Sequence, residues 1–230
     1  QLLEVMFNLS DVAVVGQFAD YRALGAVGST TILVTLFTGF LIGMGSGVNV
    51  QVALGLGAKD DKTVEKTIHT AFLICAAIGI VIGVFCILFA RPMLQALHTK
   101  SDLIDAAVLY LKIYALGMPA MAVYNFGNGV LSAKGDTKSP LIYLAVAGVL
   151  NIILNLIFVI GFHLAAAGVA IASAIAQYVS MLLVIRNLLK RRDVCRLQVS
   201  KIQFHHDVAK GILLMGIPTG MQNAIFALAN

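Results

Sequence analysis

Two carboxylates lie in the apolar opening stretch of the chain, QLLEVMFNLSDVAVVGQF. Glu4 and Asp11 are seven residues apart, two helical turns, and Asn8 lies between them, so the three form a polar stripe on one face of a helix. An ionised side chain in the middle of a bilayer costs about 2.5–3.5 kcal/mol on insertion scales, so such an acid faces a cavity or a partner. The stripe therefore marks these acids as candidates for a functional site, with Asp11 deeper than Glu4, for which an ordinary charge at the membrane surface stays open.

Two further polar pairs have helical spacing in apolar surroundings. Asn151 and Asn155 are four residues apart in LNIILNLIFVI, and Ser173 and Gln177 are four apart in GVAIASAIAQ. Amides and hydroxyls in lipid often hydrogen-bond neighbouring helices, and that structural alternative stays open, as does a neutral structural carboxyl at position 11. The functional interpretation is a polar cavity lined with Asp11. Additional candidates for this cavity are Asn8, Thr38 and Asn125.

The composition of the whole chain explains why these polar residues are conspicuous. The chain has 230 residues, of which 60% are hydrophobic and 12% are charged, and its mean hydropathy is +0.93. Soluble domains carry about 25% charged residues. So few charges cannot cover an aqueous surface, and the apolar excess extends over the whole chain, so we expect a multi-pass integral membrane protein.

The apolar stretches predict an all-α, polytopic bundle of transmembrane helices. A spanning helix needs about 20 apolar residues, and six stretches qualify, followed by the start of a seventh; they lie near 1–18, 27–52, 68–90, 104–132, 140–162 and 164–185, and from 211 onward. Apolar runs begin at residue 1 and stop at Asn230, so we expect a piece of a longer protein with a truncated first span. The basic segment 186–210 is predicted to be a cytoplasmic linker.

The distribution of basic residues sets the expected orientation. If the first span runs outward, twelve of the sixteen Lys and Arg residues lie in inside connectors, and only Arg22, Arg91, Lys100 and Lys112 lie outside. This asymmetry follows the positive-inside rule and explains the net charge of +5. It fits the inner membrane of a bacterium. Because membrane topology also explains the basic run in 186–210, we expect no nucleic-acid partner.

The sequence lacks the patterns of catalytic and nucleotide-binding sites. It contains no G-x-x-x-x-G-K-[ST], H-E-x-x-H, G-x-S-x-G or C-x-x-C. We therefore expect no enzyme, no metal site and no cofactor. A membrane protein with buried acids and without a nucleotide site fits a transporter driven by an ion gradient.

Several stretches together resemble one family of such transporters. NLSDVAVVGQFADYRALGAVG (8–28) resembles the first span and the following loop of a MATE-type multidrug and toxin extrusion transporter, and GMGSGVNVQVALGLGAKDD (43–61) resembles the end of its second span. YNFGNGVLSAKGDTKSPL (124–141) carries the GDTKxP signature. The fifth and sixth spans match in 151–177, and GIPTGMQNAI (216–225) is similar to the start of the seventh.

The resemblance implies a monomeric twelve-helix protein of two six-helix lobes, which alternates between inward- and outward-facing states. In this chain the N-terminal lobe would be 1–185, the linker 186–210, and the start of the second lobe 211–230. The family expels organic cations in exchange for Na⁺ or H⁺, and the resemblance gives the coupling role to the acid of the first span, here Asp11, with Asn151, Asn155 and Ser173 as polar partners and Glu4 as a possible second acid.

One departure from the family pattern concerns Asn155. Many relatives have an acid followed by proline where this chain has Asn155-Leu156, so the two-carboxylate version of the mechanism does not carry over. Two alternatives remain open: a flippase of lipid-linked sugars from the same superfamily, and a membrane scaffold that transports nothing. The flippase favours basic residues in its spans, and here only Lys112 lies within one.

Overall fold

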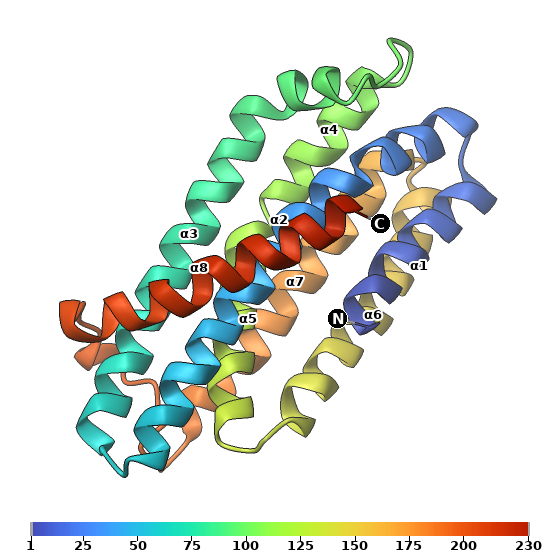
Figure 1. Cartoon of the computed structure of the whole chain (residues 1–230). Coiled ribbons are helices and arrows are strands. Elements are labelled where there is room, and N and C mark those ends of the chain that lie inside the picture. Colours follow the sequence, from blue (N-terminus) through green and yellow to red (C-terminus); the bar gives the residue numbers. More distant parts are fainter. Residues whose placement is uncertain (1, 230) are drawn as a thin grey trace. The chain divides into compact units, whose positions relative to one another are not determined.

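The structure, a computed structural model, describes the backbone of residues 2–229 and the side chains of residues 10–226. The described chain is mostly helical and contains no strand (Figure 1). Its elements are α1 (Leu2–Phe18), α2 (Tyr21–Gly57), α3 (Asp61–Ala96), α4 (Ile104–Ala115), α5 (Met118–Ala133), α6 (Lys138–Leu156), the π-helical turn η1 (Ile157–Gly161), α7 (Ala165–Lys190), the 3₁₀ turn η2 (Val199–Lys201) and α8 (His206–Ala229).

The long helices are apolar enough to cross a membrane. Among the described residues, α2, α3, α6 with η1, and α7 each pass by length and hydropathy, and the bent pair α4 and α5 makes a fifth candidate span. The outer surface of α3 shows why: Val81, Val84 and Leu88 recur once per turn and are exposed by half or more. An exposed apolar stripe of this kind is stable against lipid and not against water.

Several helices are longer than the apolar stretches predicted. The second extends over 21–57 and the third over 61–96, because polar residues at the membrane surface continue a helix beyond the hydrocarbon. The predicted linker 186–210 is likewise helical at both ends: α7 continues to Lys190, and α8 begins at His206. Only residues 191–205 form the irregular connection.

The helices are arranged in two compact units, each built from three segments of the chain. One unit contains Gln1–Val34, Val81–Met118 and Leu144–Val179, and the other contains Thr35–Ile80, Pro119–Tyr143 and Ser180–Asn230. Helices α2, α3, α6 and α7 contribute to both units. The polar residues of α1, of the second half of α6 and of the first half of α7 therefore belong to one and the same unit.

The predicted fourth span is broken. Helices α4 and α5 meet at an angle of 43°, and the break at residues 116–117 comes just before Pro119, which has no backbone N–H to continue the helix. On the α4 side, the hydroxyl of Tyr178 donates to the carbonyl oxygen of Leu116 at 3.0 Å. A hydrogen bond from α7 thus satisfies a carbonyl that the break exposes.

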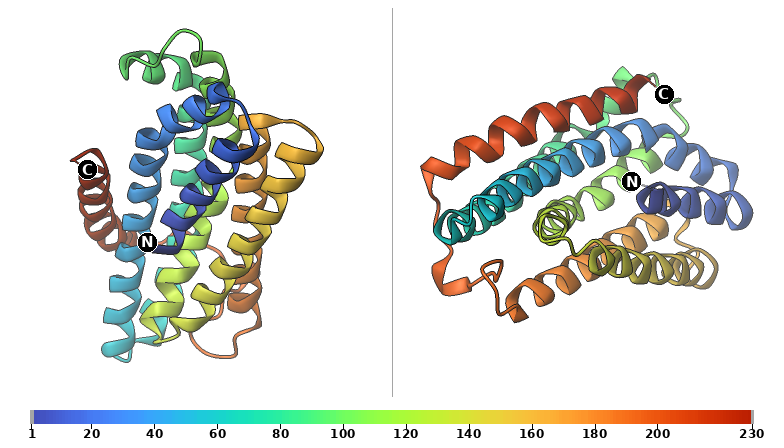
Figure 2. Two further views of the ribbon diagram at one scale, coloured as in Figure 1. Left: turned by 90° about the vertical axis from the view of Figure 1, so that its right-hand side faces the viewer. Right: turned by 60° about the horizontal axis from the view of Figure 1, so that its bottom comes forward.

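Glycines of α2 allow two other helices to approach closely. A Cβ on Gly47 would lie 2.5 Å from the Cα and N of Gly216 in α8, and a Cβ on Gly45 would lie 2.6 Å from the carbonyl oxygen of Asn125 in α5. Figure 2 shows α8 running beside this part of α2 in both views. Close backbone approach at small residues is how helices associate in lipid, so these glycines are a packing feature.

The irregular connection between α7 and α8 is attached to the start of α3. The backbone N–H of Gln198 donates to Nε2 of His69 at 3.1 Å, and that of His205 donates to Oγ1 of Thr70 at 3.0 Å. Two surface ion pairs, Lys201 with Glu65 and Lys66 with Asp207, flank these bonds. The segment is thus held on the protein at several points along its length.

Candidate functional site

Three helices of one unit bring together four of the polar residues singled out in the sequence. Asp11 comes from α1, Asn151 and Asn155 come from α6, and Ser173 comes from α7. Their side chains are no more than 2% exposed. The i, i+4 spacing places both asparagines on one face of α6, so a single helix presents two amides to the same place.

The four side chains form a closed ring of hydrogen bonds, which we call the Asp11 ring. Nδ2 of Asn155 donates to Oδ1 of Asp11 at 2.7 Å, and Oγ of Ser173 donates to Oδ2 of Asp11 at 2.7 Å. Nδ2 of Asn151 donates to Oγ of Ser173 at 3.0 Å, and its Oδ1 accepts the other N–H of Asn155 at 3.2 Å. Each helix is thereby tied to the other two.

The directions of these bonds favour a carboxylate at Asp11. Both of its oxygens accept, the single O–H of Ser173 points toward one of them, and both N–H groups of Asn155 are used within the ring. A proton on Asp11 would add a donor facing other donors. Ser173 would then have to turn its hydrogen away, or one hydrogen bond would have to open, so the ring distinguishes the two charge states of Asp11.

The charge of this carboxylate is not balanced by a basic side chain. Among the described residues, no Lys or Arg forms an ion pair with Asp11, and its partners are all neutral. A buried charge without a counter-charge is unfavourable, even when it is hydrogen-bonded. Binding of a proton or of a small cation would relieve this cost.

One oxygen of the ring lacks a hydrogen-bond donor. Oδ1 of Asn155 is buried and accepts no hydrogen bond from the described part of the chain. Buried acceptors are usually satisfied, so an unsatisfied one calls for an explanation. Together with the carboxylate oxygens of Asp11, it supplies the hard oxygen ligands that alkali and alkaline-earth cations prefer. An amide oxygen and a carboxylate are chemically suitable ligands for Na⁺, and the carboxylate can also take up a proton.

The backbone of α6 changes immediately after Asn155. The helix ends at Leu156 and continues as the π-helical turn η1, in which the N–H of Phe162 donates to the carbonyl oxygen of Ile157 at 3.1 Å. Helix α1 packs against this turn. Single π-helical turns are rare and often lie at functional sites. No sequence signal indicated it, because the apolar run LIFVIGF also fits a continuous α-helix.

A comparison with family models now identifies the fold that carries this ring. The model described as MatE matches residues 1–157, which is more than half of the chain. The chain belongs to the MatE family. The expectation drawn from the sequence motifs is thereby confirmed, and so is the expected class of all-α polytopic membrane protein.

Named relatives and solved structures agree with this assignment. "Probable multidrug resistance protein YpnP" of Bacillus subtilis is 28% identical over 220 residues, which are 96% of this chain and 49% of the relative. "FAD transporter" of Shewanella oneidensis is 23% identical over 231 residues, 95% of this chain and 51% of the relative. The chain spans about half the length of the MatE relatives that it matches.

The solved MatE structures show the fold. "Crystal structure of MATE in the bent conformation" superimposes with a TM-score of 0.92 at 21% sequence identity, over 99% of this chain and 51% of that chain. "Inward-facing conformation of a multidrug resistance MATE family transporter of the MOP superfamily" gives 0.89 at 21% identity, over 97% and 51% of the two chains.

The other residues that the sequence suggested lie elsewhere or are not described. The side chains of Glu4 and Asn8 fall outside the described residues. Gln177 lies on α7 one turn beyond Ser173, and its amide oxygen fills the space at Gly117, beside the break between α4 and α5. Its packing there is structural, and its role in a substrate cavity stays a prediction.

Thr38 and Asn125 belong to the other compact unit. Nδ2 of Asn125 donates to the carbonyl oxygen of Met121 in its own helix at 3.0 Å. Oγ1 of Thr38 is buried and has no hydrogen-bond partner among the described residues. These contacts neither require nor assign a substrate, so both residues remain candidates from the sequence alone.

The hydroxyl of Ser173 offers a test of the ring in this MatE chain. Ser173→Ala removes the donor to Oδ2 of Asp11 and the acceptor of Asn151, whereas Ser173→Thr keeps the hydroxyl. Loss of one hydrogen bond to a buried charged group changes binding by about tenfold or more. We expect Ser173→Ala in the full-length protein to change the cation affinity by about this factor, measured by calorimetry, and Ser173→Thr to stay near wild type. Equal affinities for wild type and Ser173→Ala would contradict the ring's part in cation binding.

Proposed function

We propose that the full-length protein containing this chain exports organic cations across the membrane in exchange for Na⁺ or H⁺, by alternating access. The proposal rests on the buried carboxylate of Asp11, which has hydrogen-bond donors but no basic partner among the described side chains. The positive-inside pattern supports insertion in the inner membrane of a bacterium. We expect the full-length protein to act as a monomer.

In the proposed mechanism, the Asp11 ring changes its packing with its charge. A bound proton or Na⁺ neutralises the charge of Asp11. A proton also adds a donor to the ring, so that the direction of at least one hydrogen bond no longer fits, whereas Na⁺ competes with Asn155 and Ser173 for the carboxylate oxygens. After release of the cation, the carboxylate again accepts from Asn155 and Ser173, as in the ring described above. A ligand shifts a conformational equilibrium only by its different affinity for the two states, and the ring supplies such a difference.

The position of the ring connects this local change to a helix movement. Asp11 lies on α1, and its two direct partners lie on α6 and α7, so a lost bond loosens α1 from one of them. The π-helical turn η1 lies against α1 and is the least regular part of that helix pair. We place the movement that accompanies cation exchange at the contact between α1 and η1.

The relatives support a small-molecule substrate but differ in its charge. Several bear names of multidrug resistance or export proteins, and one is named an FAD transporter, whose substrate is anionic. We favour a cationic substrate because the buried polar residues of the described chain include Asp11 but no Lys or Arg. The flippase alternative gains no support from these relatives.

Transport by the full-length protein in proteoliposomes tests the proposal. Ethidium would be the cationic substrate and FAD the anionic comparison, each with an imposed Na⁺ gradient, an imposed pH gradient, or neither. We expect ethidium movement driven by at least one of the two gradients and abolished when it is collapsed. Movement of FAD without ethidium would overturn the substrate class. Ethidium movement that is indifferent to both gradients would overturn cation coupling.

A further inference from the structure

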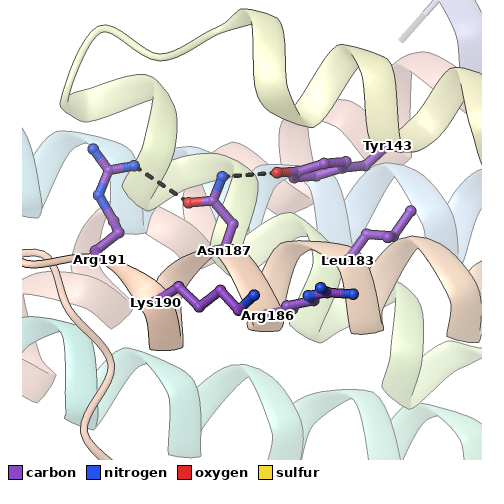
Figure 3. A pocket seen from close by; sticks show the side chains of 6 residues that line it. All are labelled: Tyr143, Leu183, Arg186, Asn187, Lys190 and Arg191. Carbon is purple, nitrogen blue, oxygen red and sulfur yellow. Dashed lines mark hydrogen bonds between the residues drawn. The ribbon is translucent and has the colours of Figure 1, made fainter.

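A pocket at the end of α7 contains basic side chains that the transport mechanism does not use. It has a volume of about 420 Å³ and is lined by Tyr143 of α6 and by Leu183, Arg186, Asn187, Lys190 and Arg191, of which the last follows directly after α7 (Figure 3). All six residues belong to the same compact unit. The positive-inside pattern places this end of α7 in the cytoplasm.

The three basic residues of the pocket differ in how their charges are balanced. Arg191 pairs with Asp193 at 3.2 Å and with Asp136 at 3.7 Å. Burial raises the pKa of Asp193. The hydrogen bonds and the charge of Arg191 together lower it by more than burial raises it, so the pKa lies below its usual range and the acid remains ionised. The acids near this pocket therefore already pair with Arg191, and Asp193 pairs with Lys134 as well, at 3.8 Å.

Arg186 and Lys190 have no such acids. They are four residues apart on α7, so they share one face, and both line the pocket drawn in Figure 3. No acidic side chain of the described residues forms an ion pair with either of them. Two neighbouring cations at the end of a helix repel each other, and an anion between them would remove this repulsion.

A neutral donor completes the pocket. Nδ2 of Asn187 donates to the hydroxyl oxygen of Tyr143 at 2.7 Å, and Oδ1 of Asn187 accepts from Nη1 of Arg191 at 3.4 Å. Because the oxygen of Tyr143 accepts this bond, its own hydrogen is available to a ligand. The pocket thus combines two basic groups with a fixed hydroxyl donor, a set that recognises phosphate oxygens.

Exposed apolar side chains lie close in sequence to the residues that line the pocket. Leu183 lies one turn further into α7 than Asn187, and Leu182 is 59% exposed. On α6, Leu141 and Ile142 next to Tyr143 are exposed by more than half. An anion with a hydrocarbon tail matches this combination, because its headgroup meets the basic residues while its chains meet exposed apolar side chains.

We propose that this pocket binds the phosphate headgroup of an anionic phospholipid of the cytoplasmic leaflet, of the phosphatidylglycerol type. Arg186 and Lys190 contact the phosphate, and the hydroxyl of Tyr143 donates to one of its oxygens. The bound lipid holds the cytoplasmic ends of α6 and α7 together. The site is separate from the Asp11 ring and does not depend on what the protein transports.

The test uses the full-length protein in detergent, with phosphatidylglycerol and phosphatidylcholine of identical acyl chains as probes. Native mass spectrometry would measure the lipid retained by wild type and by Arg186→Gln/Lys190→Gln. We expect wild type to prefer phosphatidylglycerol, and the double variant to lose about tenfold or more of its affinity for that lipid, since each basic residue near the membrane surface contributes to the attraction. Tyr143→Phe should weaken binding less.

A matched control separates the pocket from general charge. Lys62→Gln/Lys210→Gln removes two exposed basic residues outside the pocket and should bind phosphatidylglycerol as wild type does. Equal loss in both double variants, or no loss in Arg186→Gln/Lys190→Gln with circular dichroism unchanged, would overturn the site. Displacement of the lipid by equimolar inorganic phosphate would overturn a lipid as its ligand and indicate a soluble anion instead.

Discussion

Asp11→Asn in the full-length protein is expected to reduce cation-coupled efflux to background. The substitution removes the one ionisable group of the ring and keeps the size and shape of the side chain. Without a carboxylate, the ring has neither a site for a proton nor a charge to bind Na⁺, and its hydrogen bonds no longer depend on cation binding. Efflux of ethidium from an efflux-deficient bacterium, compared at matched expression, measures this loss.

The folded structure should tolerate the same change. Asn at position 11 still accepts from Asn155, although its amide faces Ser173 and leaves that hydroxyl to find another acceptor. The loss of about one hydrogen bond is offset by removal of a buried charge that has no counter-charge. We therefore expect insertion and thermal stability close to those of wild type, which separates a lost function from a lost fold.

A second measurement makes the result specific to cation binding. A ligand that binds only the folded protein raises its melting temperature as its concentration exceeds the Kd. If Na⁺ is the coupling ion, Na⁺ should raise the melting temperature of wild type and leave that of Asp11→Asn unchanged. Asp20→Asn is the matched control: Asp20 is exposed and caps α2 through the N–H of Ala23 at 2.9 Å, a bond that Asn can also accept. Normal efflux by well-expressed Asp11→Asn would refute the assignment.

The residues of the ring could be recognised in the sequence because each is a polar residue within an apolar membrane span. A carboxylate and two amides stand out among leucines and isoleucines, and helical spacing puts Asn151 and Asn155 on one face. What the sequence could not supply is the pairing between helices. That Ser173 donates to Asp11, while Gln177 on the same face of α7 packs at the α4–α5 break, depends on helix rotation and tilt.

In the fold, too, features with a local cause in the sequence could be recognised, and features that depend on contacts between distant residues could not. The break in the fourth span has a local cause, because Pro119 lacks the backbone N–H that would continue the helix. The π-helical turn after Asn155 has no local signature. In the basic run after Ile185, charge alone made Arg186, Lys190 and Arg191 equivalent, and only the contacts of Asp136 and Asp193 separate the paired arginine from the others.

Helix packing gives the other prediction with a large effect: Gly47→Ala should destabilise the protein, whereas Gly28→Ala in the same helix should not. A Cβ on Gly47 would lie 2.5 Å from the Cα and N of Gly216 and 3.1 Å from the carbonyl oxygen of Ile212. These are backbone atoms of α8, so no side chain can rotate away and the two helices must separate. A Cβ on Gly28 meets nothing within 4 Å.

Intrinsic helix propensity favours alanine over glycine at both positions. Any destabilisation by Gly47→Ala must therefore come from the steric clash, which makes the comparison sharp. Alanine is better than glycine in a helix by up to about 1 kcal/mol, so Gly28→Ala should be neutral or slightly stabilising. At Gly47, overpacking of about 1–3 kcal/mol exceeds this gain. We expect the melting temperature of the full-length protein in detergent to fall by about 2–6 °C for Gly47→Ala alone. If the two variants have the same melting temperature, α2 and α8 do not approach each other closely at Gly47. A fall for Gly47→Ala that is accompanied by weaker dye efflux would indicate that the close α2–α8 contact also matters during transport.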